Sequence, residues 1–114
     1  MNQDPGEMVV LSKVINFVGL AHRAGKVSIG ADRCFPAIRG RSAALVFLAA
    51  DAGANTAKKV RDKSAFYHIP LCQRLDRNQL GQACGHSQVV VMTVNDTGFA
   101  TKLKEYLAEI NWEV

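Results

Sequence analysis

The sequence predicts an α/β protein folded as a three-layer α/β/α sandwich around a small sheet of about four strands. Short apolar segments alternate with helix-like segments along its 114 residues, and two of the apolar segments are hydrophobic on both faces. No linker or internal repeat interrupts this alternation. We therefore expect one domain over residues 9–110, between a loose N-terminal segment over 1–8 and a C-terminal tail over 111–114.

Each element is expected from its own local pattern. The helices have apolar residues at helical spacing or a capping box, and the strands are short apolar runs between turn residues. Glycine closes two helices and proline stops a third. In chain order we expect a helix over 9–23, a strand over 27–29, a helix over roughly 32–40, a strand over 44–50, a helix over 55–68, a strand over 71–75, a short helix over 76–85, a strand over 88–94 and a helix over 97–110.

Acidic residues next to these helices are interpreted as caps. Asp76, with Gln79 three residues later, fits a capping box, and Asp96 is placed to cap the last helix. Asp51 follows a buried strand, where a catalytic acid could stand, but a turn or cap explains it better. Pro36 lies past the first turn of its helix and removes a hydrogen bond there, so this helix is expected to start late or to be distorted.

The composition argues against several protein classes. No apolar run approaches the roughly 18 residues needed to span a bilayer, and the N-terminus lacks the basic region of a secretory signal. We therefore expect a cytoplasmic protein with no membrane partner. The cysteines have no CxxC spacing and the histidines add no ligand spacing, so we expect reduced, mostly buried thiols and neither a metal nor a cofactor. These residues are Cys34, Cys72, Cys84, His22, His68 and His86.

No motif for catalysis is found. GLAHRAGKV, residues 19–27, has five residues between its glycines where a phosphate loop has four, and Val27 stands where that loop needs Ser or Thr. No GxGxxG follows a strand, and no serine or cysteine lies in a nucleophile motif. The chain is therefore expected not to be an enzyme.

Positive charge is concentrated in the body of the chain. All 14 basic residues, but only half of the ten acidic ones, lie between Met8 and Lys104, which favours a polyanionic partner. Within this region, VSIGADRCFP (27–36) joins a strand through Gly30 to a helix. Unpaired N–H groups at such a helix start can bind an anion. The alternative is that Gly30 merely lets the chain turn.

An ordered series of motifs over about residues 9–107 resembles a known family. GLAHRAGK, LVFLAADAGANTAKKVRDK, YHIP, LGQACG and NDTGFATKL follow one another as in bacterial YlxQ-like proteins of the kink-turn-binding ribosomal protein family, the archaeal and eukaryotic large-subunit seven-Ae/thirty-e type. The resemblance implies a four-stranded mixed sheet and a non-enzymatic bacterial protein that binds structured RNA, with a kink-turn or a bulge. Ribosomal RNA, the ribosome or another ribonucleoprotein are the implied partners, and we expect a monomer.

The resemblance also implies where RNA is bound. The strand–Gly–helix junction enters the RNA major groove beside sheared G·A pairs, where Gly30 permits close approach of the backbone. The loop before LGQACG packs against a flipped base, and Leu75 between two arginines is expected to stack on it. Charges on the helix over 55–68 are interpreted as a solvated face: Lys58, Lys59, Arg61 and Lys63. The predicted RNA-binding residues, placed at one side of the sheet, are Lys26, Gly30, Ala31, Asp32, Arg33, Arg74, Leu75, Arg77 and Asn78.

The junction departs from the pattern of specific kink-turn binders. They have Gly-x-Asn-Glu-x-x-Lys where this chain has Gly30, Asp32, Arg33 and Pro36. Arg33 could donate to guanine O6 and N7, and Asp32 could accept from a base amino group, but Pro36 removes the lysine donor. One alternative is therefore a protein-interaction module of the same fold that has lost selective kink-turn reading. Another is an accessory domain of an RNA-modifying enzyme, which would need a separate catalytic chain.

Overall fold

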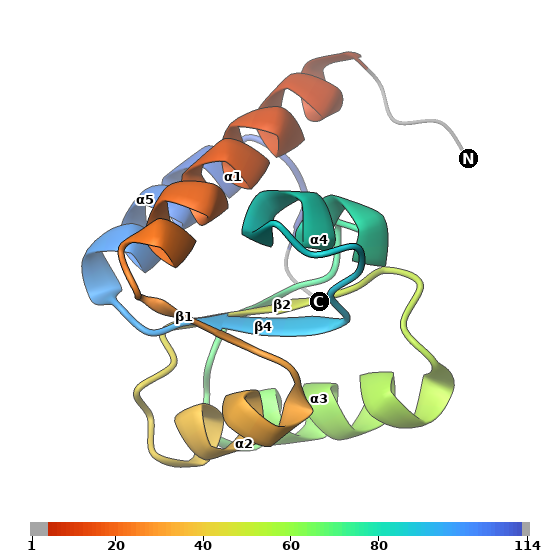
Figure 1. The fold of residues 1–114 in the computed structure, drawn as a ribbon, viewed down its shortest axis with the longest axis vertical. Coiled ribbons are helices and arrows are strands. Elements are labelled where there is room, and N and C mark those ends of the chain that lie inside the picture. The colour runs from red at the N-terminus through yellow and green to blue at the C-terminus, as the bar shows by residue number, and fades with distance from the viewer. Residues whose placement is uncertain (1–4, 113–114) are drawn as a thin grey trace.

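The computed structural model describes residues 5–112, which form five helices and a four-stranded sheet (Figure 1). The strands are short apolar runs and the helices are amphipathic, as the sequence pattern predicts. In chain order the elements are α1 (Pro5–Arg23), β1 (Val27–Ile29), α2 (Ala31–Arg39), β2 (Leu45–Leu48), α3 (Ala54–Phe66), β3 (Leu71–Cys72), α4 (Arg77–Cys84), β4 (Val91–Val94) and α5 (Thr97–Leu107).

The sheet is mixed, with the strand order β1-β4-β2-β3. β4 runs antiparallel to both of its neighbours, with Val94 opposite Val27 on one side and Leu45 on the other, whereas β2 and β3 are parallel. β1, β2 and β3 therefore all point the same way. Their carboxyl ends lie at one edge of the sheet, together with the start of β4.

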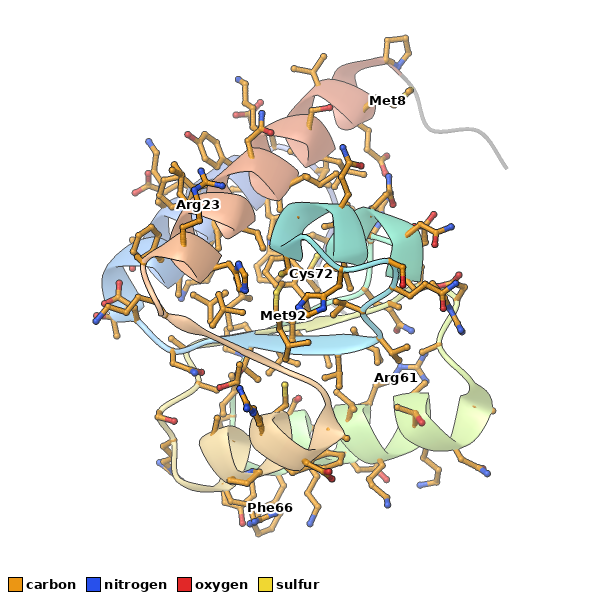
Figure 2. The ribbon with its side chains drawn as sticks, in the orientation of Figure 1. Met8, Arg23, Arg61, Phe66, Cys72 and Met92 are labelled. Atoms are coloured by element: carbon orange, nitrogen blue, oxygen red, sulfur yellow. The ribbon has the colours of Figure 1, made fainter. Side chains whose placement is uncertain are left out.

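Helices cover both faces of this sheet, which confirms the predicted three-layer sandwich. α1, α4 and α5 lie on one face and α2 and α3 on the other (Figure 1). Every residue of β2 and β4 is buried, as expected for central strands packed on both sides. Two hydrophobic clusters form the core. Cys72 and Met92, both in the larger cluster, lie between the sheet and the helices on the α4 side (Figure 2).

Residues 5–8 and 111–112 are more ordered than predicted. α1 begins at Pro5, a residue suited to a first helical position because its missing N–H is not needed there. The prediction of a loose segment is therefore wrong for residues 5–8, and residues 1–4 lie outside the described part. The predicted tail is wrong for Asn111, whose C=O accepts from Arg74, and for Trp112, which packs against the core. Residues 113–114 lie outside the described range.

Local capping predictions are confirmed. Asp76 and Gln79 form a reciprocal capping box at the start of α4, and the Asp96 carboxylate accepts from the Phe99 N–H at 2.9 Å. α2 begins at Ala31 and continues through Pro36, so its expected late start is wrong. The proline lies within a helix whose last turn still closes, with the Gly40 N–H donating to the Pro36 C=O at 2.9 Å.

Candidate nucleic-acid interface

Four segments meet where β1, β2 and β3 end and β4 begins. We call this surface the carboxyl edge; it comprises residues 30–33, 49–51, 73–78 and 86–90. Hydrogen bonds connect its parts: the Gly30 N–H donates to the Val91 C=O at 3.0 Å, and the Ala50 N–H donates to the Leu75 C=O at 2.8 Å. All of the predicted RNA-binding residues except Lys26 therefore lie in the segments of the carboxyl edge, although Leu75 is buried beneath it.

Lys26 lies at the opposite ends of the strands, across the sheet from the carboxyl edge. Its C=O accepts from the Asn95 N–H at 2.8 Å, where β1 begins and β4 has just ended. A residue that precedes a strand and one that follows it lie at opposite ends of that strand, so Lys26 and Gly30 are separated by the whole of β1. The prediction that Lys26 shares a side of the sheet with the other residues is wrong.

Gly30 has a backbone conformation that other residues rarely adopt. Its φ of 89° and ψ of 153° are essentially reserved for glycine, so the turn itself requires this residue. Its C=O accepts from the N–H groups of Arg33 and Cys34 at 3.2 and 2.9 Å, which makes Gly30 the N-cap of α2. A Cβ at this position would meet nothing within 4 Å. The space in front of the glycine is therefore open.

The first turn of α2 lacks a side-chain cap. The N–H groups of Ala31 and Asp32 make no backbone hydrogen bond within the described residues and are left for solvent or for a partner. Asp32 and Arg33 are both exposed there, and within residues 5–112 the Arg33 side chain makes neither a hydrogen bond nor an ion pair. This turn therefore offers backbone donors and one unengaged guanidinium to a polyanion.

The loop over 73–78 is organised differently, because its apolar residue points inward. Leu75 is only 1% exposed and lies in the core cluster with Leu80 and Met92. Burial of a leucine side chain is worth about 1.5–3 kcal/mol to the fold. The prediction that Leu75 offers a surface for base stacking is therefore wrong.

Both arginines of this loop have partners within the protein. Arg74 forms an ion pair with Glu7 of α1 and donates to the Asn111 C=O, so it ties the loop to segments near both chain ends. The Arg77 guanidinium donates to the Asp51 C=O at 2.7 Å. Neither guanidinium is as available as that of Arg33. Asn78, in the first turn of α4, is exposed.

Asp51 acts as a structural acceptor. Its carboxylate accepts the Arg77 backbone N–H at 3.0 Å and lies 3.4 Å from the Arg77 guanidinium. The backbone hydrogen bond from Arg77 is the main cause that lowers the pKa of Asp51, with the charge of Arg77 adding to it. This arrangement confirms the interpretation of Asp51 as a turn or cap residue.

The sequence analysis missed the segment over 86–90. The predicted strand begins at residue 88 and no element is predicted for 86–87, but β4 begins only at Val91, and residues 86–88 are exposed at the carboxyl edge. Gly81 of α4 allows this segment to pack closely, since a Cβ there would lie 2.7 Å from the His86 C=O oxygen and 2.8 Å from that of Ser87. The feature that places this segment at the carboxyl edge is the antiparallel direction of β4, which brings the start of that strand to this edge.

Other kinds of site find no support in the part of the chain that the structure describes. Over residues 5–112, no three His, Cys, Asp or Glu side chains are grouped so that they could hold a metal ion. Cys34, Cys72 and Cys84 are buried and unpaired, and burial raises the pKa of each thiol to about 11. None of the helices described combines the length and the hydropathy needed to cross a membrane.

Sequence comparisons identify close relatives. Residues 12–104 match the Ribosomal protein L7Ae/L30e/S12e/Gadd45 family. RNA-binding protein YlxQ of Enterococcus faecium is 41% identical over 95 residues, which cover 83% of this chain and 91% of that protein. RNA-binding protein YlxQ of Bacillus subtilis (strain 168) is 46% identical over 86 residues, which cover 75% of this chain and 86% of that protein.

Solved structures agree with this relationship. A protein of unknown function from Bacillus halodurans C has a TM-score of 0.80 at 36% identity, covering 84% of this chain and 97% of its own. The Giardia lamblia 15.5kD RNA binding protein has a TM-score of 0.74 and covers 95% and 97%, and at 19% identity it shows the fold alone. The family and both YlxQ proteins are named for ribosomes and RNA rather than for a reaction, which confirms the prediction of a non-enzymatic protein. The chain belongs to the Ribosomal protein L7Ae/L30e/S12e/Gadd45 family.

Proposed function

We propose that this protein binds structured RNA through its carboxyl edge, as a non-enzymatic protein of the cytoplasm. The observation that supports this most strongly is the Gly30 junction, where a glycine-only backbone conformation, open space and the exposed start of α2 coincide. The concentration of basic residues in the body of the chain provides general attraction for a polyanion. The names of the two YlxQ relatives, each an RNA-binding protein, support the same function.

A kink-turn is the RNA structure that fits this junction best. Gly30 has no side chain to keep a nucleotide away from the backbone. Arg33, in the first turn of α2, can donate two hydrogen bonds to O6 and N7 of a guanine in a sheared G·A pair. Asp32 can accept from a base amino group, although it would repel a nearby phosphate.

The segment over 86–90 replaces Leu75 as the proposed contact for an unpaired base. It lies beside the Gly30 junction, because the Gly30 N–H donates to the C=O of Val91, the residue that follows this segment. Val90 is half-buried and the three residues before Val89 are exposed, so the segment combines an apolar side chain with polar groups. An extruded base can stack on such a surface while its edge is hydrogen-bonded.

Filter binding to a kink-turn RNA and to a straightened mutant of it tests this function. We expect tighter binding to the kink-turn and an affinity that falls steeply with salt. Each neutralised duplex phosphate contributes about −0.9 to the log–log slope, so a few phosphate contacts give a total of about −3 to −4. Equal binding to both RNAs with a flat salt response would overturn the proposal.

That outcome would favour the second candidate, a protein-interaction module of the same fold. The reason for it is that Asp32 and Pro36 stand where the pattern expected of specific kink-turn binders has asparagine and lysine. Pro36 is exposed in α2 and provides no donor to RNA. We also propose binding to ribosomal RNA, to a ribosome or to another ribonucleoprotein, and the same assay can examine these partners. We further propose that the protein is a monomer, which sedimentation of the free protein can examine.

A further inference from the structure

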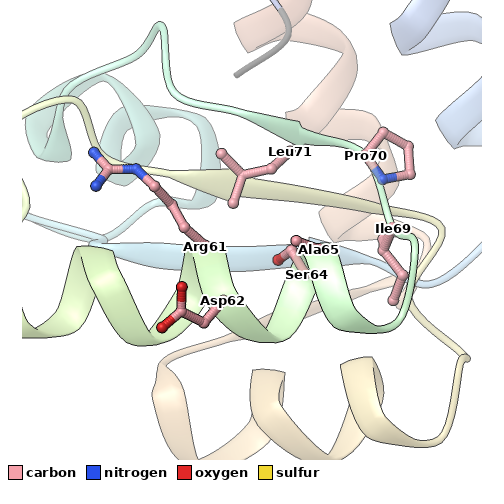
Figure 3. Close-up of a pocket in the computed structure, with 7 residues that line it drawn as sticks. All are labelled: Arg61, Asp62, Ser64, Ala65, Ile69, Pro70 and Leu71. Atoms are coloured by element: carbon pink, nitrogen blue, oxygen red, sulfur yellow. The ribbon is translucent and has the colours of Figure 1, made fainter.

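The outer side of β3 has a groove that is separate from the Gly30 junction. It lies between α3 and the chain that leads into β3, with a volume of about 310 Å³ (Figure 3). β3 is at the end of the strand order opposite to β1, so the groove and the junction are separated by the whole width of the sheet. α3 contributes Arg61, Asp62, Ser64 and Ala65 to the groove, and the opposite wall contains Ile69, Pro70 and Leu71.

Ser64 provides the groove with an unsatisfied polar group. Its residue is 2% exposed, and its Oγ has no hydrogen-bond partner in the described structure. Most buried hydroxyls do have a partner, because an unpaired one is unfavourable by about 1–3 kcal/mol. Figure 3 shows Ser64 on the side of α3 that faces the β3 segment. Less than 1 Å² of this hydroxyl is exposed, so a polar group that entered the groove would satisfy it by moving the atoms that cover it.

The backbone of β3 adds an unpaired donor and acceptor. The Pro70 C=O accepts from the Val46 N–H of β2 at 2.9 Å, so Pro70 points toward β2. Backbone groups of successive residues in a strand point in opposite directions, and those of Leu71 therefore point away from β2. β3 is an edge strand of the described sheet. Leu71 can accordingly pair with an added strand.

The surroundings of the groove favour a negatively charged occupant with some apolar surface. Among the charged residues of α3, Asp62 is the single acid against four bases, and it is paired with Lys58 at 2.8 Å. Arg61, which lines the groove, donates only to the neutral Gln73 Oε1, at 2.9 and 3.1 Å. Ile69, Pro70 and Leu71 supply the apolar part of the lining.

We propose that the groove between α3 and β3 binds an extended acidic peptide segment of a partner protein as an added strand. The peptide backbone pairs with Leu71, one small polar side chain reaches the Ser64 hydroxyl, and a carboxylate pairs with Arg61. A second copy of this chain fits less well, because two basic α3 helices would then lie close together. This surface would let the protein bind RNA and a protein partner at the same time, but its existence does not depend on RNA binding.

Selection from a phage-displayed library of random twelve-residue peptides tests the proposal. We expect the enriched peptides to be acidic and rich in β-branched residues. Ser64→Ala should weaken the binding of synthetic peptides by about two- to tenfold, as expected for one hydrogen bond, and Arg61→Gln by about two- to fivefold. The charge-matched control is Lys102→Gln on α5, which lies on the other face of the sheet and should leave peptide affinity unchanged.

Two further measurements separate the possible occupants. Two peptides are compared, one N-methylated at its odd-numbered residues and the other at its even-numbered residues. Only one of the two should lose binding, because only one edge of an added strand faces β3. Ser64→Ala should remain folded, since it removes an unpaired hydroxyl and alanine favours helices, and thermal unfolding checks this. Its affinity for the kink-turn RNA should equal that of the wild type, so the two proposals fail independently.

Several results would overturn the inference. The selection could enrich no peptides, or the enriched peptides could bind Ser64→Ala and Arg61→Gln as tightly as the wild type. Methylation at odd-numbered and at even-numbered residues could also weaken binding equally. Displacement of a bound peptide by single-stranded RNA would assign the groove to nucleic acid instead. A concentration-dependent dimer that Ser64→Ala abolishes would assign it to a second copy of the chain.

Discussion

Two arginine-containing connections at the carboxyl edge have the same topology, but their arginines differ in whether they are bound within the protein. Both the junction over 30–33 and the loop over 73–78 lead from a strand into a helix. In the junction, Arg33 is exposed and has no partner within the described residues, whereas Arg74 and Arg77 are engaged by other parts of the protein. An arginine at this edge is therefore available to RNA only if its guanidinium is not already bound within the protein, whatever its position along the edge.

Gly30→Val should give the largest effect, because it strains the junction and fills the space in front of it. Forcing a β-branched residue to a φ of 89° is unfavourable by about 1–3 kcal/mol. We expect affinity for kink-turn RNA to fall by more than about 100-fold, or about 2.7 kcal/mol. Urea unfolding and filter binding measure the two losses separately.

The matched control is Gly53→Val, at the N-cap of α3. Gly53 has an ordinary φ of −61° and equally open space around a Cβ. This variant should lose some stability, because valine is a poorer N-cap than glycine, but it should keep an RNA affinity close to that of the wild type. If Gly30→Val instead unfolds the protein outright, the glycine serves folding first, and its role in RNA approach loses its support.

Gly81→Ala tests whether the segment over 86–90 depends on close packing against α4. The new Cβ would lie within 3.0 Å of backbone atoms of His86, Ser87 and Gln88, so the segment must move. Overpacking of this kind is destabilising by about 1–3 kcal/mol, and we expect weaker RNA binding because the proposed base contact is displaced. Hydrogen exchange of the amides over 86–90 measures the movement. Unchanged exchange with weakened binding would contradict this explanation.

Asp51→Asn should give the smallest effect, and one that depends on pH. The pKa of Asp51 is lowered in the folded protein, so its carboxylate stabilises the fold above its unfolded pKa of about 4 and this contribution is lost as the pH falls further. The wild type should therefore be slightly more stable than the variant at pH 7, with a difference that shrinks toward pH 3. Urea unfolding at both values checks this. A difference that grows with acidity would contradict the assigned role.

The fold was predictable because its signals are local. The both-sided hydrophobicity of β2 and β4 marks the central strands, and the caps at Asp76 and Asp96 each involve a residue only three positions away. The site was only partly predictable, because it depends on distant partners. The ion pair of Arg74 with Glu7 joins residues far apart in sequence, and no local pattern indicates it.

Two errors of the site prediction have the same physical origin. The sequence shows that Leu75 lies between two arginines, but only the packing of α4 on the sheet shows that this side chain is needed in the core. Likewise, Lys26 and Gly30 are close in sequence, but β1 separates them to opposite edges. For Gly30 the sequence allows two explanations, a simple turn or close approach to a ligand. Its φ shows that the turn requires glycine, and the open space above it is compatible with close approach.

Comparing Arg33→Ala with Arg77→Ala on two RNAs shows whether the unengaged arginine of this edge reads the RNA. The RNAs are a kink-turn with its G·A pairs intact and the same RNA with those pairs disrupted. If the free guanidinium of Arg33 reads a guanine, Arg33→Ala should cost about 1–3 kcal/mol on the intact RNA and much less on the disrupted one. Arg77→Ala, whose guanidinium is bound to Asp51, should change both affinities only slightly. Equal losses for Arg33→Ala on both RNAs, or a loss for Arg77→Ala as large as that for Arg33→Ala, would contradict the account.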